Sequence, residues 1–539
     1  MSLLMMQFRL VGGWLVLAAF ASVVSGLSNA SLLAVINHSL MLPPGGLADV
    51  ALKFVFLAAL MLGTRVLAET LFMWLGQKVK ATLRKDVVNH VSETAWAQLE
   101  KTGMAKAVSI LTQDLDTLVV FFVSLPGLLI YGAAIVGCLI YLGTLSWQVL
   151  QLALLVLGLG AMGYRAAHGK ALGLLRSSRQ REDTLIAQCK KLFDGGREFR
   201  LNPRRRRHFV DGPLSENIEA VRIERTRGYV FYGLAKSWGS VLFFAFIGVV
   251  LYWLRESLTL SSAVMTGYTM IFLYMIVPVE GVLSALPTVT SARIALQRIA
   301  QLKTDLPQEK LLPLKSLPRF DSLELADIRY EYQGEEGERF TLGPLNLRFT
   351  RGELVFLVGG NGSGKTTLAN LLVGLYPPDS GDLRLNGRLI APEQREIYRQ
   401  HFAVVFNDFF LFDDVDNVHE RTADQVDKLL HLLKLDHKVA FRHGRFSTTA
   451  LSQGQRKRLA LLQAWLENRP FYLFDEWAAD QDPGFKEVFY KVLLPMLKAE
   501  GKTVLAITHD DRYFPLADRL IKLESGQVVA DCVLRPLSV

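Results

Sequence analysis

The chain has few cysteines and few charged residues. Cys138, Cys189 and Cys532 are its three cysteines among 539 residues, and they lie far apart in the sequence. They form neither a metal-binding cluster nor an even-numbered disulfide framework, so we expect three free thiols. Only 21% of residues are charged and 50% are apolar, which excludes a disordered chain and argues against a wholly soluble one.

Long apolar runs are absent after residue 300, whereas earlier they recur at the length of roughly 20 residues that a bilayer-spanning helix needs. The mean hydropathy of the whole chain is +0.25. We predict spans at Leu10–Ile36, Val50–Leu75, Leu118–Leu142, Trp147–Tyr164, Ser237–Leu254 and Leu260–Leu286. The alternative for the first span is a cleaved signal peptide, but five further spans favour an uncleaved helix.

Basic residues are distributed unequally among the loops. Residues 78–116 carry six Lys and Arg and residues 165–236 carry seventeen, whereas the loops at 37–49, 143–146 and 255–259 together carry only Arg255. Because cytoplasmic loops are enriched in Lys and Arg, the two long loops are predicted to be cytoplasmic. An even number of spans then places both termini in the cytoplasm.

The two long loops keep helical spacing of apolar residues, which predicts helices that extend well beyond the bilayer. The net charge of +9 and the run Arg204–Arg207 raise the alternative of a nucleic-acid partner. A solvated loop near anionic lipid headgroups explains that run without such a partner, so we expect membrane lipid and no nucleic acid as a partner.

The carboxyl-terminal part has a different pattern. Residues 301–322 hold three prolines without sustained periodicity, which predicts a linker between a membrane domain at 1–300 and a second domain at 323–539. In the second domain short β-rich runs alternate with helical stretches, as in an α/β nucleotide-binding domain. The predicted fold is therefore a six-span α-helical membrane domain fused to an α/β P-loop ATPase domain.

The strand "ELVFLVG" leads into "GGNGSGKT" and then into an apolar helix, so the sequence G-x-x-x-x-G-K-[ST] has the context of a P-loop. Glycines let backbone N–H groups surround phosphate oxygens, Lys365 reaches the β and γ phosphates, and the Thr366 hydroxyl coordinates Mg²⁺. The residues expected to bind ATP here are Gly359, Asn361, Gly362, Ser363, Gly364, Lys365, Thr366 and Thr367.

A second acidic motif ends the apolar strand "RPFYLFDEW". We expect Asp475 to hold Mg²⁺ and Glu476 to polarise the water that attacks the γ phosphate. An ordinary strand ending in surface acids is the alternative.

Together these motifs resemble the ATPase domain of an ABC transporter. Between them "LSQGQ" at 451–455 resembles the family's signature, with Gln453 in place of the first glycine. The resemblance implies that Ser452, Gly454 and Gln455 contact the ATP held by a second subunit, with help from the helix dipole.

The same resemblance assigns three further residues. His509, after the strand "TVLAIT", corresponds to the switch histidine that contacts the γ phosphate, and Tyr332 corresponds to the aromatic that stacks on adenine, with Tyr330 as the alternative. Asn407 stands where the family has the glutamine of the glutamine loop. It is implied as a Mg²⁺ ligand, directly or through a water, while the alternative is that its loop only signals to the membrane helices.

The order of six spans and then one ATPase domain resembles a half-size exporter. One P-loop and one signature per chain imply a homodimer, and coupling helices are expected around 95–110 and 195–215. The motifs look like the branch that exports cyclic peptides, pyoverdine-type siderophore peptides and microcins from Gram-negative bacteria, which implies the inner membrane as the location. Lipid or multidrug export is one alternative cargo, and a membrane-tethered regulator or gated channel is an alternative of another class.

Charged residues within the predicted spans are candidates for cargo binding. Arg65 and Glu69 are four residues apart, so an intrahelical salt bridge is the simpler interpretation. We expect Glu280, with the aromatics Tyr268, Phe272 and Tyr274, to line a cavity or, alternatively, the aromatics to pack in the bundle.

Overall fold

The computed structural model describes residues 2–40, 47–102, 104–254, 262–309, 317–333, 339–415 and 423–534. The chain divides into two compact units. Unit 1 comprises residues 1–86 and 108–300, and unit 2 comprises residues 87–107 and 301–539. A short segment that lies between two membrane helices in the sequence therefore packs with the carboxyl-terminal half.

The amino-terminal part is built from long helices. Six described helices are long and apolar enough to cross a membrane: Gly12–Ser39, Ala48–Ser92, Lys106–Leu145, Trp147–Asp194, Pro203–Trp253 and Val264–Asp305. Each of the six predicted spans falls on one of them, although Leu260, the predicted start of the last, lies outside the described residues. The six-span prediction is confirmed.

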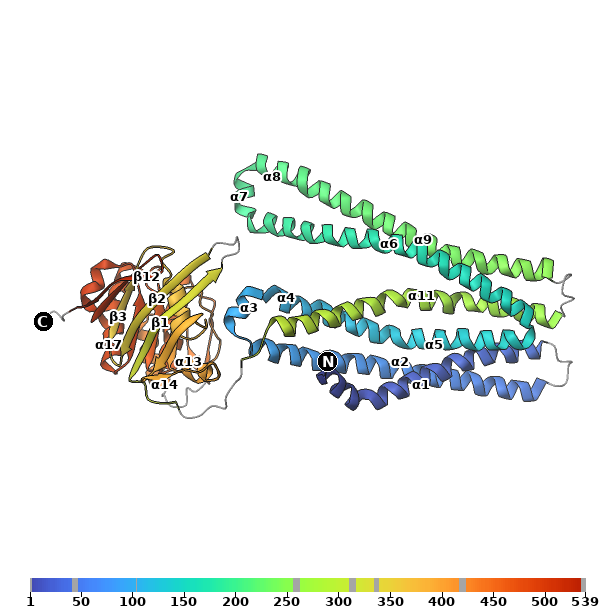
Figure 1. The fold of residues 1–539 in the computed structure, drawn as a ribbon, viewed down its shortest axis with the longest axis horizontal. Coiled ribbons are helices and arrows are strands. Elements are labelled where there is room, and N and C mark those ends of the chain that lie inside the picture. Colours follow the sequence, from blue (N-terminus) through green and yellow to red (C-terminus); the bar gives the residue numbers. More distant parts are fainter. Residues whose placement is uncertain are drawn as a thin grey trace. The chain divides into compact units, whose positions relative to one another are not determined.

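The helices before residue 306 are α1 (Ser2–Ser39), α2 (Leu47–Ser92), α3 (Trp96–Thr102), α4 (Met104–Ser109), α5 (Leu115–Leu145), α6 (Trp147–Asp194), α7 (Gly196–Leu201), α8 (Pro203–Phe209), α9 (Ser215–Val249) and α11 (Ser262–Asp305). Helix α6 has 48 residues, which at about 1.5 Å per residue exceeds the bilayer core of about 30 Å twofold. The predicted extension of the spans is thereby confirmed. Figure 1 shows α6 and α9 side by side, joined by α7 and α8.

Small residues allow the helices to approach closely. A Cβ atom on Gly26 of α1 would lie 2.3 Å from the Ile130 carbonyl of α5, and a Cβ on Gly163 of α6 would lie 2.1 Å from the Trp238 ring nitrogen of α9. Close approach at glycine strengthens van der Waals packing, the main attraction between helices in lipid. These positions fix the α1–α5 and α6–α9 pairs.

Unit 2 contains two main β-sheets. A six-stranded sheet has the order β12-β11-β3-β10-β9-β6, with β12 as its antiparallel edge, and a four-stranded antiparallel sheet has the order β2-β1-β4-β5. The strands are β1 (Ser322–Gln333), β2 (Arg339–Thr350), β3 (Leu354–Val358), β4 (Ser380–Leu385), β5 (Arg388–Leu389), β6 (Phe402–Val405), β7 (Phe441–Arg442), β8 (Arg445–Phe446), β9 (Phe471–Asp475), β10 (Thr503–Ile507), β11 (Arg519–Glu524) and β12 (Gln527–Val533). The helices are α12 (Lys365–Leu372), α13 (Arg395–Arg399), α14 (Ala423–Leu432), α15 (Gln453–Leu466), α16 (Pro483–Val488) and α17 (Leu494–Ala499).

The parallel core of the larger sheet explains its continuous apolar strands. All five residues of β3 are buried, and those of β9 and β10 are buried as well. Side chains alternate between faces, so Phe356 joins one hydrophobic cluster while Val355 and Leu357 join the other. Burial on both faces holds the carboxyl ends of these strands, where the motif residues lie, in fixed positions.

The region that was expected to be a linker has structure at both ends. Helix α11 continues to Asp305, and the Glu309 carboxylate receives two hydrogen bonds of 2.7 Å from the Arg399 guanidinium. The ring nitrogen Nε2 of His401 lies 3.0 Å from the Pro318 carbonyl. Residues 310–316 lie outside the described residues. The chain is therefore anchored to unit 2 on both sides of this gap.

Short helices occupy both regions where coupling helices were expected. Helices α3 and α4 lie within 95–110, and α7 and α8 lie within 195–215. Helix α3 belongs to unit 2, where Gln98 donates a hydrogen bond to the Asp305 carbonyl at 3.0 Å.

Candidate functional site: a phosphate-binding loop and its acidic strand

The loop between β3 and α12 has the conformation of a phosphate cradle. Gly362 and Gly364 have φ angles of 74° and 97°. Residues other than glycine adopt such angles only with strain. A Cβ atom on Gly359 would lie 2.3 Å from the Leu523 carbonyl, so this position also requires glycine. The Ser363 hydroxyl is buried without a hydrogen-bond partner among the described residues. A buried hydroxyl of this kind in a glycine loop at the start of a helix fits a phosphate group.

Lys365 folds back onto this loop. Its ammonium donates hydrogen bonds of 3.0 Å to the carbonyls of Gly359 and Gly360 and lies 3.7 Å from the Glu476 carboxylate. The residue is buried, so its charge is exposed to little water. An incoming phosphate would therefore find a cation already held at the loop.

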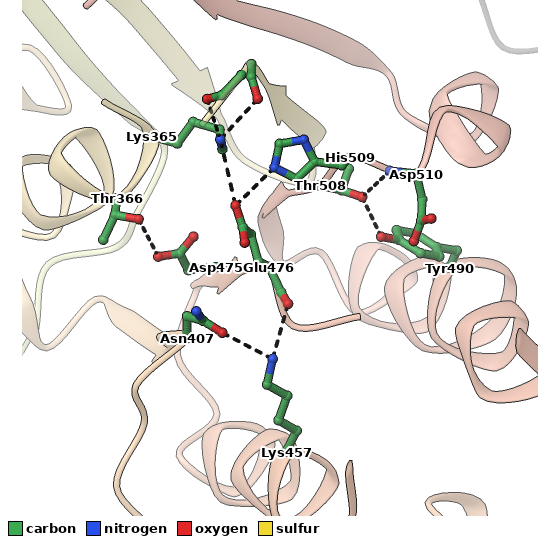
Figure 2. Close-up of polar contacts among 12 residues, drawn as sticks. Lys365, Thr366, Asn407, Lys457, Asp475, Glu476, Tyr490, Thr508, His509 and Asp510 are labelled. Carbon is green, nitrogen blue, oxygen red and sulfur yellow. Dashed lines mark hydrogen bonds and ion pairs between the residues drawn. The ribbon is translucent and has the colours of Figure 1, made fainter. Parts of the chain in front are cut away.

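Thr366 and Asp475 come together although they are far apart in the sequence. The Thr366 hydroxyl donates a hydrogen bond of 3.0 Å to Oδ2 of Asp475, at the end of β9 (Figure 2). Burial raises the pKa of Asp475, although the Thr366 hydrogen bond acts in the opposite direction. A hydroxyl and a carboxylate are the hard oxygen donors that Mg²⁺ prefers, and a nearby divalent cation would favour the charged carboxylate. The residues therefore fit this ion.

Glu476, the next residue, is in the left-handed region with a φ of 49°. Such a conformation costs about 1–3 kcal/mol outside glycine and needs surrounding contacts to persist. The Glu476 amide donates to the Ile507 carbonyl at 3.2 Å, and Oε1 lies 3.1 Å from Nε2 of His509. Figure 2 shows the Glu476 carboxylate between Lys365 and His509, the arrangement expected of an acid and a switch histidine at one phosphate site.

The loop after β10 that carries His509 is held by its neighbours. The Thr508 hydroxyl lies 2.6 Å from the Tyr490 hydroxyl and accepts a hydrogen bond of 3.1 Å from the Asp510 amide. The Asp510 carboxylate pairs with Lys486 at 3.1 Å. The half-exposed His509 ring is therefore presented from an ordered backbone.

Asn407 contacts a residue that the motifs did not indicate. Its carbonyl oxygen Oδ1, the atom that would ligate Mg²⁺, lies 3.2 Å from the ammonium of Lys457 in α15. The sequence does contain a signal for Lys457, because it is four and eight residues from the buried Leu461 and Trp465 on one face of the helix. A lysine among buried apolar positions of a helix needs polar partners.

The signature segment begins α15 and contacts the loop after β9. The Ser452 amide donates to the Gln455 side chain at 3.3 Å, and the Gly454 carbonyl accepts from Gln481 at 3.0 Å. Gln453 donates a hydrogen bond of 3.1 Å to the Asp480 carboxylate. The implied contacts of Ser452, Gly454 and Gln455 with the ATP of a second subunit remain predictions.

The structure separates the two tyrosine candidates for adenine. Tyr330 is buried and stacks on Tyr376 with ring centroids 5.2 Å apart, whereas 41% of Tyr332 is exposed. Burial raises the pKa of Tyr330 to about 12. Only Tyr332 is positioned to receive a base, and its stacking role remains a prediction. Asn361 and Thr367 lie in or beside the loop, and their contacts with ATP remain predictions too.

The membrane helices contain a cavity of about 380 Å³, lined by Tyr131, Tyr164, Tyr232, Ser240, Phe243 and Glu280 among others. Ser240 donates a hydrogen bond of 3.3 Å to Glu280. Glu280 lines this cavity, as expected, whereas Tyr268 and Phe272 follow the alternative interpretation and pack in the helix bundle. Both are buried in the helix core, and the Tyr268 hydroxyl donates to the carbonyls of Leu142 and Ser146.

Tyr274 packs against the same hydrophobic cluster. The expected pair of Arg65 with Glu69 is present, at 2.9 Å between Nε and Oε1. The predicted intrahelical salt bridge is confirmed, and about half of each of the two side chains is exposed.

Comparisons with known proteins agree with this geometry. The ABC transporter family model matches residues 342–479. The chain is 34% identical to the ATP-binding protein SyrD of Pseudomonas syringae pv. syringae, over 84% of this chain and 83% of that protein. It is 24% identical to the ATP-dependent lipid A-core flippase of Vibrio parahaemolyticus serotype O3:K6, over 97% and 92% of the two chains.

A solved structure shares the complete architecture. A bacterial Atm1-family ABC exporter with ATP bound superposes with a TM-score of 0.76 over 97% of this chain and 95% of that chain, at 16% sequence identity. The likeness confirms the predicted fold. The SyrD relationship and the phosphate cradle show that the chain belongs to the ABC transporter family, as a multi-pass membrane protein that binds ATP and couples its hydrolysis to transport.

Proposed function

We propose that this exporter moves a modified or cyclic peptide, such as a siderophore precursor or a microcin-like peptide, out of the cytoplasm across the bacterial inner membrane. ATP hydrolysis as the driving reaction is supported by one observation: Lys365, Glu476 and His509 meet at one phosphate cradle. The cargo class is supported by the motif resemblance to cyclic-peptide exporters and by the chemistry of the membrane cavity.

In the proposed hydrolysis reaction Glu476 accepts a proton from the water that attacks the γ phosphorus of ATP. His509 holds the Glu476 carboxylate and contacts the γ phosphate, and Lys365 balances its charge. Mg²⁺ held by Thr366 and Asp475 would neutralise negative charge on the β and γ phosphates. Asn407 would reach that ion directly or through a water, because the hydrogen bond from Lys457 uses one of the two lone pairs of its carbonyl oxygen.

We propose a homodimer as the working form. Each chain has one P-loop at 359–366 and one signature at 451–455. Within one chain the signature contacts the loop at 480–481, through the Gln453 side chain and the Gly454 carbonyl. Two composite ATP sites then require the signature of each subunit to meet the P-loop of the other. The excess of Lys and Arg in residues 78–116 and 165–236 supports cytoplasmic termini, which expose the ATPase domain to ATP.

The cavity fits a molecule with both apolar and hydrogen-bonding groups. Its lining is largely apolar, and the tyrosine hydroxyls, Ser240 and Glu280 supply a few polar contacts. Ligand sites are typically of this kind, with volumes of roughly 300–1,000 Å³. A compact modified peptide has this mixed surface.

The decisive experiment measures ATP-dependent accumulation of fluorescent cyclic peptides in inverted vesicles, together with peptide stimulation of ATPase activity. Gly239 of α9 lines the cavity, and a Cβ atom there would meet nothing within 4 Å. Gly239→Leu should fill part of the cavity and abolish both peptide accumulation and stimulation.

Gly233 provides a matched control on the same helix. It is equally open to a Cβ atom and lies outside the cavity lining, so Gly233→Leu should transport peptide normally. If Gly239→Leu accumulated peptide at the wild-type rate, the cavity would not be the path of the cargo.

Lipid is the second candidate cargo. The flippase of Vibrio parahaemolyticus, whose name specifies lipid A-core, aligns over 97% of this chain, including the membrane helices. ATPase stimulation by lipid and by no peptide in the panel would favour this candidate. ATP hydrolysis without ATP-dependent accumulation of any cargo would instead favour a regulator or gated channel.

A further inference from the structure

Lys457 is a buried lysine that contacts three functional segments, which are those of Asn407, Glu476 and Asp480. Only 2% of its side chain is exposed. Its ammonium lies 2.8 Å from Oδ2 of Asp480, 3.2 Å from Oδ1 of Asn407 and 3.4 Å from the Glu476 carbonyl. An ammonium has three protons to donate, and these three acceptors can use all of them. Figure 2 shows Lys457 reaching toward Asn407 and Glu476 from α15.

Burial of this charge is not explained by packing. A buried ammonium loses several kcal/mol of hydration, and apolar residues of similar volume usually give equal or greater stability. The neighbours Leu461 and Trp465 would accommodate an apolar side chain at this face of α15. An apolar residue could not donate hydrogen bonds, so it could not connect the three acceptors as Lys457 does.

The contact with Glu476 bears on the proposed chemistry. Glu476 has a left-handed φ of 49°. Its amide donates to the Ile507 carbonyl, and its own carbonyl accepts from the Ala479 amide at 3.2 Å and from the Lys457 ammonium at 3.4 Å. The direction of its carboxylate depends on that backbone conformation. A residue that holds the Glu476 carbonyl therefore helps to aim the carboxylate at the attacking water.

Two departures from the family pattern meet in the same network. Asn407 is one methylene shorter than the glutamine expected at its position, and the long Lys457 side chain reaches its oxygen. Gln453, which replaces a glycine of the signature, donates to the same Asp480 oxygen that receives Lys457. The substitutions at 407 and 453 are thus connected through Lys457 and Asp480.

We propose that Lys457 is a positioning residue for ATP hydrolysis, which ties Asn407, the Glu476 backbone and Asp480 into one network so that Glu476 and Asn407 are aligned together. This inference rests on the proposed role of Glu476. Lys457 itself contacts no substrate. Its effect should therefore appear in kcat and leave the ATP contacts of the P-loop intact.

The test uses the protein in lipid vesicles and the variant Lys457→Met, which keeps an unbranched side chain only one atom shorter and removes its donors. We expect kcat for ATP to fall about 10- to 100-fold, because small misplacements of a reacting group have effects of that size. The KM for ATP should change less than about twofold, since phosphate binding is separate from the altered step. Lys491→Met is the control, because Lys491 forms an exposed pair with Glu487 and should keep normal kinetics.

A second comparison distinguishes positioning from simple structural support. Lys457→Gln shortens the side chain at position 457 by one bond. Asn407→Gln lengthens the side chain at position 407 by one methylene. The double variant should recover most of the kcat lost in Lys457→Gln, because the hydrogen bond between the two positions is restored. No recovery in a folded double variant, or wild-type kcat in Lys457→Met, would overturn the proposal.

Glu476→Gln, measured in parallel, separates this inference from the proposed function. If Glu476→Gln hydrolyses ATP at the wild-type rate, the proposed base is wrong and the inference falls with it. If Glu476→Gln is inactive while Lys457→Met is fully active, only the inference about Lys457 fails. Thermal unfolding of each variant shows whether lost activity reflects lost folding.

Discussion

The Tyr376 hydroxyl donates a hydrogen bond of 2.6 Å to Oε2 of Glu100. Glu100 lies in α3, between two membrane helices in the sequence, and Tyr376 follows α12, the helix that begins at the phosphate loop. Burial, followed by the Glu100 contact, raises the pKa of Tyr376 well above its usual value. This side-chain contact thus joins α3 to the segment that follows α12.

This contact predicts that Tyr376→Phe will weaken coupling between transport and hydrolysis. The ring can keep its stacking with Tyr330, so only the hydrogen bond to Glu100 is lost. We expect cargo stimulation of ATPase activity to fall severalfold while the protein remains folded, with a loss of roughly 1–2 kcal/mol in stability. Glu100→Gln keeps an acceptor and should be milder. Equal, full stimulation in wild type and Tyr376→Phe would contradict the prediction.

Glu476→Gln should nearly abolish turnover while ATP still binds. The amide cannot accept the proton of the attacking water, and loss of a general base typically lowers kcat about 10²- to 10⁴-fold. Single-turnover hydrolysis and nucleotide binding measure the two effects separately. Glu487→Gln on the exposed surface of the same domain is the matched control and should behave as wild type. Retained hydrolysis would remove Glu476 from its assigned role.

Thr366→Val should raise the Mg²⁺ concentration needed for ATPase activity. Valine preserves the shape of the side chain but lacks the hydroxyl that lies 3.0 Å from Asp475. Titration of activity with Mg²⁺ after chelation should show no hydrolysis without the ion, and a curve displaced to higher Mg²⁺ in the variant. Superimposable curves would show that Thr366 is not a ligand.

Asp480 should make the ATPase domain sensitive to acid. The hydrogen bond from Lys457 is the main reason that the pKa of Asp480 is lowered. A lowered folded-state pKa gives stability that is present above the ordinary aspartate pKa of about 3.9 and is lost as pH falls through the folded value. Because Asp480 is largely solvated, the effect should be small.

The measurement for Asp480 is the pH dependence of thermal unfolding. Asp480→Asn should show a smaller loss of thermal stability than wild type between about pH 5 and pH 3. An unchanged dependence in the variant would mean that other carboxylates dominate the acid response.

The features that the sequence predicted correctly are those that depend on short stretches of the chain. The P-loop residues Gly362 and Gly364 lie within one turn, so their backbone conformations follow from a short motif. The six spans follow from hydropathy because length and composition alone determine which helices can cross a bilayer. These predictions needed no knowledge of distant contacts.

Features that depend on distant contacts were not predicted. The face of α11 that packs inward is set by neighbouring helices, so the sequence left open whether Tyr268 and Phe272 would line a cavity or pack in the core. Lys457 likewise acquires its partners at positions 407, 476 and 480 only when three loops meet. A lysine on an apolar helix face was the available signal, but it does not identify the partners.

Residues 87–107 pack in unit 2, although they are synthesised well before the rest of that unit. These residues leave the ribosome before residue 301, roughly 10 to 40 s earlier at 5–20 residues per second. Over that interval Ala97, which later packs against a hydrophobic cluster of unit 2, has no finished surface to cover it. The nascent membrane protein must therefore retain an incompletely packed loop until the final strand of its carboxyl-terminal domain has been made.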